Sequence, residues 1–185
     1  MMSFYDLNLH QLHLVFKYLK IESFAIMVIH ALGSVMVIFA GQNFGVRNID
    51  RIFKSIGYSA VFSFGWGLFI FIITMFLTNP IASIFSQNSE VIHITANYLK
   101  ILSFSYSFFG ILLISISIFN DINRPIPSAI FSALRMIGIY VPLAWITSQF
   151  FGLNAIFWSG FAANILSGIF TYFWLKKTLT KIISE

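Results

Sequence analysis

The sequence has no cysteine, only 6 acidic residues, and a charged fraction of 9%. The absence of cysteine excludes disulfides, thiol catalysis and Cys-ligated metals. The few acidic residues make a catalytic carboxylate pair or a carboxylate metal site improbable. The motifs G-x-x-x-x-G-K-[ST], H-E-x-x-H and G-x-S-x-G are also missing, which argues against a P-loop ATPase, a zinc protease and a serine hydrolase. We therefore expect neither an enzyme nor a bound cofactor or metal.

The chain is rich in apolar residues instead. Hydrophobic residues make up 58% of its 185 residues, 23 of them are Phe, and the mean hydropathy is +0.88. A soluble domain carries about 25% charged residues, so this composition predicts an all-α polytopic protein of the lipid bilayer. The net charge of +5 then reflects Lys and Arg retained on the cytoplasmic side, not nucleic-acid binding. The first residues lack the pattern of a signal peptide.

Five segments approach the roughly 20 apolar residues that a spanning helix requires. We expect the second to end at Asn79-Pro80, a polar connection at residues 86–90, and a kink at Pro142 in the fourth. Residues 1–19 are interpreted as an interfacial or truncated segment, 20–178 as the transmembrane bundle, and 179–185 as a cytoplasmic tail. The predicted spans are residues 21–40, 55–78, 98–119, 126–150 and 153–175.

The cations fix the predicted orientation. Seven Lys and Arg residues lie on one side of the spans and three on the other, with Arg135 inside a span. The loops at 41–54 and 120–125 and the C-terminus are therefore expected in the cytoplasm, at the plasma membrane of a bacterium. Five spans place the N-terminus outside, so either residues 4–18 lie at the interface or a helix precedes this chain. We favour the second alternative.

A polar stretch separates the first two predicted spans. Gly41 and Gly45 tolerate positive φ, and Gln42 and Asn43 offer side-chain amides to a helix end. The cations that follow include Arg47 and Arg51. We interpret the stretch as a cytoplasmic hairpin that marks topology and does not bind substrate.

Three ionisable or polar side chains near or within the spans are candidates for chemistry. Glu22 is the one carboxylate at the edge of a predicted span, either a coupling or cation-binding group or a solvated interfacial residue near Lys20. His30 shares a polar face with Ser34 that is expected to look into the bundle or a water-filled cleft. It either relays protons or bonds to a neighbouring helix.

Tyr106 is a further candidate, as an aromatic residue that faces substrate. Arg135 lies about 14 Å into its span at 1.5 Å per residue and cannot lose its proton, so we expect a structural clamp. Gly160, Asn164 and Gly168 recur every four residues, a spacing that favours close helix packing.

The runs Lys20-Ile-Glu-Ser-Phe-Ala and Gly41-Gln-Asn-Phe-Gly-Val-Arg-Asn-Ile-Asp-Arg51 resemble the second half of multidrug and toxic compound extrusion (MATE) transporters. Val46 replaces the usual Ala of that family. Further matches follow in order and cover the chain from about Lys20 to its end: Tyr98-Leu-Lys-Ile101, Gly110, Asn120 to Arg124-Pro125, Arg135, Pro142-Leu-Ala144, Gly152-Leu153 and Trp174 to Lys177.

This resemblance implies helices eight to twelve of a transporter built from two six-helix bundles, with the first lobe and helix seven absent from this chain. It implies export of a small cationic or amphipathic substrate in exchange for Na⁺ or H⁺, and a separately encoded N-terminal lobe as a partner. The acidic coupling residues of such transporters lie on helices outside this chain. The alternatives are a flippase for lipid-linked saccharides, with a related helix plan, and a membrane fragment that does not transport.

Overall fold

The computed structural model describes residues 4–85, 89–151 and 153–184. In this part of the chain the fold is all-α, as predicted, and five helical segments are long and apolar enough to cross a membrane. The helices, in chain order, are α1 (Phe4–Gly45), α2 (Ile49–Phe85), α3 (Ser89–Leu102), the 3₁₀ helix η1 (Ser103–Ser105), α4 (Tyr106–Asp121), α5 (Pro125–Ala133), the π-helix η2 (Leu134–Tyr140), α6 (Val141–Phe151) and α7 (Leu153–Ser184).

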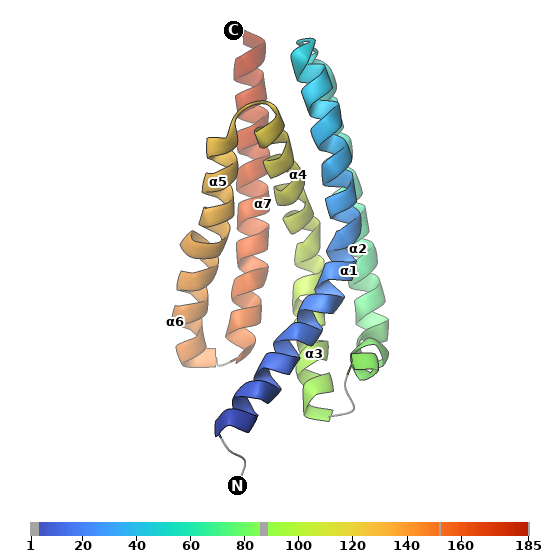
Figure 1. The fold of residues 1–185 in the computed structure, drawn as a ribbon, viewed down its shortest axis with the longest axis vertical. Helices are drawn as coiled ribbons and strands as arrows, with labels where there is room; N and C mark the ends of the chain where they lie inside the picture. Colours follow the sequence, from blue (N-terminus) through green and yellow to red (C-terminus); the bar gives the residue numbers. More distant parts are fainter. Residues whose placement is uncertain (1–3, 86–88, 152, 185) are drawn as a thin grey trace.

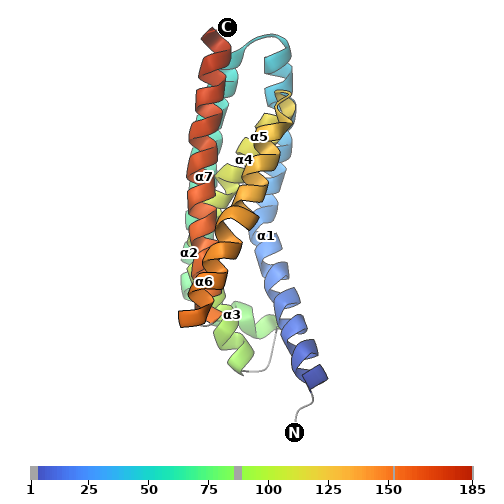
Figure 2. The same ribbon diagram turned by 90° about the vertical axis from the view of Figure 1, so that its left-hand side faces the viewer.

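Helix α4 is the centre of the bundle. It packs against α1 and α2 on one side and against α5 and α7 on the other. The turn between α1 and α2 and the C-terminus lie at one end of the molecule, whereas α3 and the connection between α6 and α7 lie at the opposite end (Figures 1 and 2). The charge distribution predicts that the first end is cytoplasmic.

The core and the surface are both apolar. A buried cluster fills the end of the bundle nearer the C-terminus and includes Ile52, Leu112, Phe119 and Leu175. Large hydrophobic side chains also cover the outside, such as Phe76, which is 81% exposed. An apolar outer surface suits a helix bundle surrounded by lipid, because the bilayer core offers no water to bind polar groups.

The turn between α1 and α2 lies within the predicted hairpin of residues 41–54, but α1 extends to Gly45 and not to residue 40 as expected. The chain turns at Val46–Asn48. Arg47 takes φ of 56°, its N–H bonds to Phe44 O (3.0 Å), and the Asn48 N–H bonds to Asn43 O (2.7 Å). This is a Schellman motif, which satisfies the last carbonyls of a helix and usually has Gly at the left-handed position. Asn48 Oδ1 then accepts from the Arg51 N–H (3.4 Å) and caps α2.

The turn between α4 and α5 uses the same backbone motif. Asn123 takes φ of 57°, and the Arg124 N–H bonds to Phe119 O at 2.9 Å. Pro125 follows at the first position of α5, where its missing N–H costs nothing. Both turns therefore end their helices by hydrogen bonding within the backbone.

Two helices extend beyond the positions where proline was expected to stop or kink them. Helix α2 passes through Pro80 and ends at Phe85, so the expected end at Asn79-Pro80 is wrong. In the fourth span the irregular segment is η2, in the turn before Pro142. Since proline removes a donor and crowds the carbonyl four residues earlier, wider π-helical spacing there relieves that crowding. The expected connection at 86–90 and the Gly152 boundary lie partly or wholly outside the described residues.

The other helices also extend beyond the limits predicted from the sequence. Helix α1 begins at Phe4, within the segment assigned to residues 1–19, and α7 continues through the expected tail to Ser184. The candidate spans are correspondingly longer than predicted. They are Glu22–Gly45, Ile49–Ile81, Ile92–Asp121, Pro125–Phe151 and Asn154–Ile183.

Two glycines clamp α4 between α2 and α7. A Cβ on Gly67 would lie 2.5 Å from the Ser107 nitrogen and 2.6 Å from its Cα, and a Cβ on Gly168 would lie 2.9 Å from the Phe108 carbonyl carbon. These are backbone contacts, so both neighbouring helices approach α4 at the same level. Close approach through small residues is the packing that the Gly160–Gly168 spacing predicted.

Candidate functional site

The 3₁₀ turn η1 interrupts the third span, and its serines bind side chains from neighbouring helices. Thr74 of α2 donates its hydroxyl to Ser103 Oγ at 2.9 Å, and Asn164 of α7 donates to Ser105 Oγ at 2.9 Å. Both serines are fully buried. A short 3₁₀ segment inside a longer helix often marks a functional hinge, and here it is the point where polar side chains of several spans meet.

Arg135 extends this network to the fourth span. Its Nη1 donates to Asn164 Oδ1 at 2.8 Å, and its guanidinium lies 4.4 Å from the centre of the Phe109 ring. The charge is thus held by an amide oxygen and an aromatic face. The contacts with Asn164 and Phe109 join the fourth span to the third span and to α7, and the role of Arg135 as a structural clamp stays a prediction.

Glu22 is the first residue of the first candidate span, and a residue of the third span holds its side chain. The Tyr98 hydroxyl donates to Glu22 Oε2 at 2.7 Å. The structure therefore joins this carboxylate of the first span to a hydroxyl of the third.

Tyr106 is 2% exposed, and its hydroxyl makes no hydrogen bond within the described residues. It lies at the inner end of a cavity of about 420 Å³ between α1, α2 and the third span, together with Phe24, Trp66 and Thr74. The Trp66 indole donates to Ala25 O at 2.8 Å and joins α2 to α1 at this cavity. Tyr106 thus places a buried aromatic ring at the wall of this cavity.

His30 is not part of this group. It is exposed on α1, on the same face as Met27 and Ser34, so the shared face is as expected but does not look into this bundle. A water-filled cleft beside α1 remains the prediction for this face. Among the residues predicted to mark topology, Gln42, Arg51, Arg124 and Pro125 are exposed and Asn43 is buried.

A comparison with protein families matches the MatE family model to residues 17–146. The chain belongs to the MATE family of transporters. It is 27% identical over 83% of its length to an FAD transporter of Shewanella oneidensis, and 25% identical over 89% to a probable multidrug resistance protein of Bacillus subtilis. It spans 34% and 37% of those two proteins, about a third of their length.

Solved MATE structures share the fold. The bent form of the Vibrio cholerae transporter VcmN aligns with a TM-score of 0.85 and 24% identity, over 89% of this chain and 37% of that one. A transporter of the MOP superfamily from Pyrococcus furiosus aligns with a TM-score of 0.85 and 18% identity, over 90% of this chain and 38% of that one. The five-span bundle therefore matches part of the fold of these solved transporters.

Several partners that complete the network in this MATE chain were not predicted from the sequence. Tyr98 stood out only within a family motif, and Thr74 and Ser105 were not singled out. The alternation Ser103-Phe-Ser105-Tyr-Ser107 places Ser103 and Ser107 on one side of an α-helix and Ser105 on the opposite side, so it indicates polar contacts with two neighbours but does not predict a 3₁₀ turn. Which helices would supply their partners depends on packing that sequence spacing does not give.

Proposed function

We propose that this chain forms part of a secondary active transporter that exports small cationic or amphipathic compounds in exchange for Na⁺ or H⁺. The observation that carries the proposal is the Glu22–Tyr98 hydrogen bond between two spans. A carboxylate at the edge of a membrane span is costly unless it faces a cavity or a partner. Binding of a proton or Na⁺ would change its charge and its contact with Tyr98.

In this proposal Glu22 is the coupling group, Tyr98 positions it, and Tyr106 borders the cavity beside it. Arg135 remains a clamp because Asn164 and Phe109 already engage its charge. The exposed polar face with His30 would contact the transport pathway. The chain would supply helices eight to twelve, and a second lobe, encoded with it or separately, would complete the pathway in the plasma membrane, with the C-terminus in the cytoplasm.

A lipid-linked saccharide flippase is the less favoured alternative. A pyrophosphate headgroup needs free cations at membrane depth, and Arg135 is engaged by its neighbours. Flavin export is a more specific competitor, because one relative is an FAD transporter. Flavin nucleotides therefore belong among the substrates to be tested.

The test is dye and flavin export from cells that express the complete gene product, with a set pH gradient or Na⁺ gradient. Glu22→Gln keeps the shape of the side chain and removes its charge. Tyr98→Phe removes the bonding hydroxyl, and Tyr58→Phe is the matched control because Tyr58 is 76% exposed on α2. We expect export to fall at least about tenfold in Glu22→Gln, because the amide still accepts from Tyr98 but cannot take up a proton or carry a charge, and to persist in Tyr58→Phe.

The outcomes separate the parts of the proposal. If the wild-type gene product exports none of the compounds under either gradient, transport by this protein is refuted. If it exports them and Glu22→Gln behaves like the wild type, Glu22 is not the coupling group. Export of FAD but not of cationic dyes would show that the substrates are flavin nucleotides and not cations. The dependence of export on the pH or Na⁺ gradient would still test the antiport mechanism.

A further inference from the structure

The third span changes its helical form at η1, although its own sequence does not force the change. From Val91 to Phe109 the chain contains neither proline nor glycine, the two residues least favourable to a helix interior. Yet ψ is −27° at Leu102, −16° at Ser105 and −27° at Tyr106, close to the values of a 3₁₀ helix. The hydrogen-bond geometry of a 3₁₀ turn is poorer than that of an α-helix, so contacts with neighbouring helices stabilise η1.

Two bonds to neighbouring helices favour the 3₁₀ form. The hydroxyl of Ser103 bonds to Thr74 of α2 and that of Ser105 bonds to Asn164 of α7, each at 2.9 Å. Successive residues turn by about 120° in a 3₁₀ helix and by about 100° in an α-helix. The two serines, two residues apart, therefore diverge by about 120° around the axis of η1 but would diverge by about 160° in an α-helix. Conversion of η1 to an α-helix would thus move at least one hydroxyl off its partner.

The segment after η1 is fixed by contacts with backbone atoms. Gly67 and Gly168 approach the backbone of Ser107 and Phe108 from opposite neighbours. Ser63 Oγ of α2 also donates to Ser107 O at 2.9 Å. Helix α4 therefore cannot turn about its axis at this level without separating from α2 and α7.

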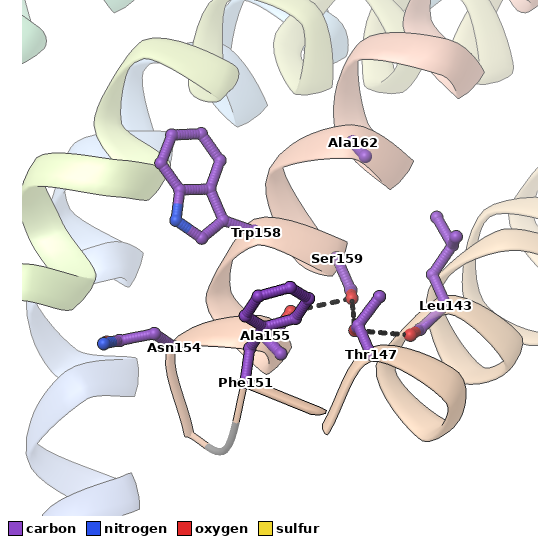
Figure 3. Close-up of a pocket in the computed structure, with 8 residues that line it drawn as sticks. All are labelled: Leu143, Thr147, Phe151, Asn154, Ala155, Trp158, Ser159 and Ala162. Carbon is purple, nitrogen blue, oxygen red and sulfur yellow. Dashed lines mark hydrogen bonds between the residues drawn. The ribbon is translucent and has the colours of Figure 1, made fainter. Parts of the chain in front are cut away.

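The segment before η1 is held differently. Helix α3 is joined to α1 by a contact between side chains, the bond from Tyr98 to Glu22. At the same end of the bundle α6 and α7 are tied to each other, because Thr147 Oγ1 and Ser159 Oγ lie 3.1 Å apart (Figure 3). Helices α6 and α7 thus form one unit, against which α3 can turn.

We propose that η1 is a rotary hinge, at which α3 turns relative to α4 when the three residues of η1 convert from 3₁₀ to α-helix. The conversion removes about 20° per residue, or about 60° in all, and shortens the span by about 1.5 Å. A point on the surface of a helix about 10–12 Å wide moves by about 5–6 Å in such a turn. That displacement takes the Tyr98 hydroxyl out of hydrogen-bond reach of Glu22.

The hinge therefore links the bonds of η1 with α2 and α7 to the bond between Tyr98 and Glu22. Loss of the first favours the α-helical form, and the turn of α3 then breaks the second. A part for this turn in transport rests on the function proposed above, in which Glu22 is the coupling group. The turn itself does not depend on that assignment.

The test measures distances between spin labels by electron paramagnetic resonance in the full chain reconstituted in bilayers. The chain has no cysteine, so labels can be attached to pairs of introduced cysteines at exposed positions. Lys100→Cys in α3 with Phe76→Cys in α2 is the α3 pair, and Asn120→Cys in α4 with Tyr58→Cys in α2 is the α4 pair. The α3 pair reports the turn, and the α4 pair reports whether the rest of the bundle moves.

Thr74→Val and Ser105→Ala each remove one of the bonds that stabilise η1. In both variants we expect the distance of the α3 pair to shift by about 5 Å, the displacement at the helix surface, and the distance of the α4 pair to stay unchanged. Thr180→Val is the matched control, because the exposed Thr180 hydroxyl bonds to Lys176 O within α7. It should change neither distance.

Circular dichroism establishes that each variant remains helical, and two separate η1 variants keep the test valid if one of them fails to fold. The proposal is overturned if the α3 pair keeps its wild-type distance in a folded η1 variant, or if the α4 pair shifts by the same amount. It is also overturned if Thr180→Val shifts the α3 pair. Because the labels report the turn without any transport, this result is independent of whether the export experiment succeeds.

Discussion

The contact between Gly168 and α4 allows a stability prediction with an internal control. A methyl group at Gly168 would meet the Phe108 carbonyl, with its carbon 2.9 Å away, whereas carbon atoms pack best at about 3.5–4.0 Å. The obstacle is backbone, so the helices have to separate. Gly65 lies in α2, and a methyl group there would have no neighbouring atom within 4 Å, so alanine at Gly65 tests the helix preference alone.

Both substitutions gain the same helix propensity of up to about 1 kcal/mol, so the difference between them isolates the steric cost. We expect Gly168→Ala to have a free energy of unfolding about 1–3 kcal/mol lower than Gly65→Ala, the usual cost of overpacking. The measurement is unfolding in mixed micelles with increasing dodecyl sulfate, followed by far-ultraviolet circular dichroism. Equal unfolding free energies for the two variants would refute the clamp of α4 by glycine contacts.

Three further changes test the remaining geometry. Arg135→Met keeps most of the length of the side chain but removes the bond to Asn164. We expect the free energy of unfolding to fall by about 1.5–3 kcal/mol in the same assay. An unchanged free energy of unfolding would show that the contacts of Arg135 add no stability. A methyl group on Gly41 would meet the carboxylate of Asp121, whose Cγ is 3.1 Å away, so Gly41→Ala should be destabilising in the wild type and nearly neutral combined with Asp121→Ala. Additive effects of those two changes would contradict this contact. Because the chain has no cysteine, Ser34→Cys reports on the exposed face of α1: a charged maleimide should label it rapidly in membranes if a water-filled cleft lies there, and failure to label would contradict the cleft.

The number of spans was predictable because it depends on composition alone. Runs of apolar residues must cross the bilayer as helices, since lipid offers no partner to an exposed backbone. The same physics explains why the predicted helix ends were wrong. Gly41 and Pro80 would end many helices in water, but α1 continues past Gly41 to Gly45 and α2 continues past Pro80 to Phe85.

Site geometry was less predictable because it depends on pairs of residues far apart in the chain. Glu22 could be singled out as a carboxylate at the edge of a span, but its partner Tyr98 is 76 residues away. His30 shows the opposite difficulty. Its polar face was recognised, but periodicity does not say whether a polar face is turned towards this bundle or away from it.

Asn164 shows most clearly why such a network needs both sequence and structure. It is 2% exposed, and arginine can only donate, so the bond from Arg135 fixes Oδ1 as the acceptor. The amide nitrogen then donates to Ser105 Oγ, and the Ser105 hydroxyl donates in turn to Leu102 O at 2.7 Å. Each donor in this chain of bonds has one defined acceptor. Aspartate would lack the donor at this position and leucine would lack both groups, so an amide is the side chain that joins the π-helical turn of the fourth span to the 3₁₀ turn of the third.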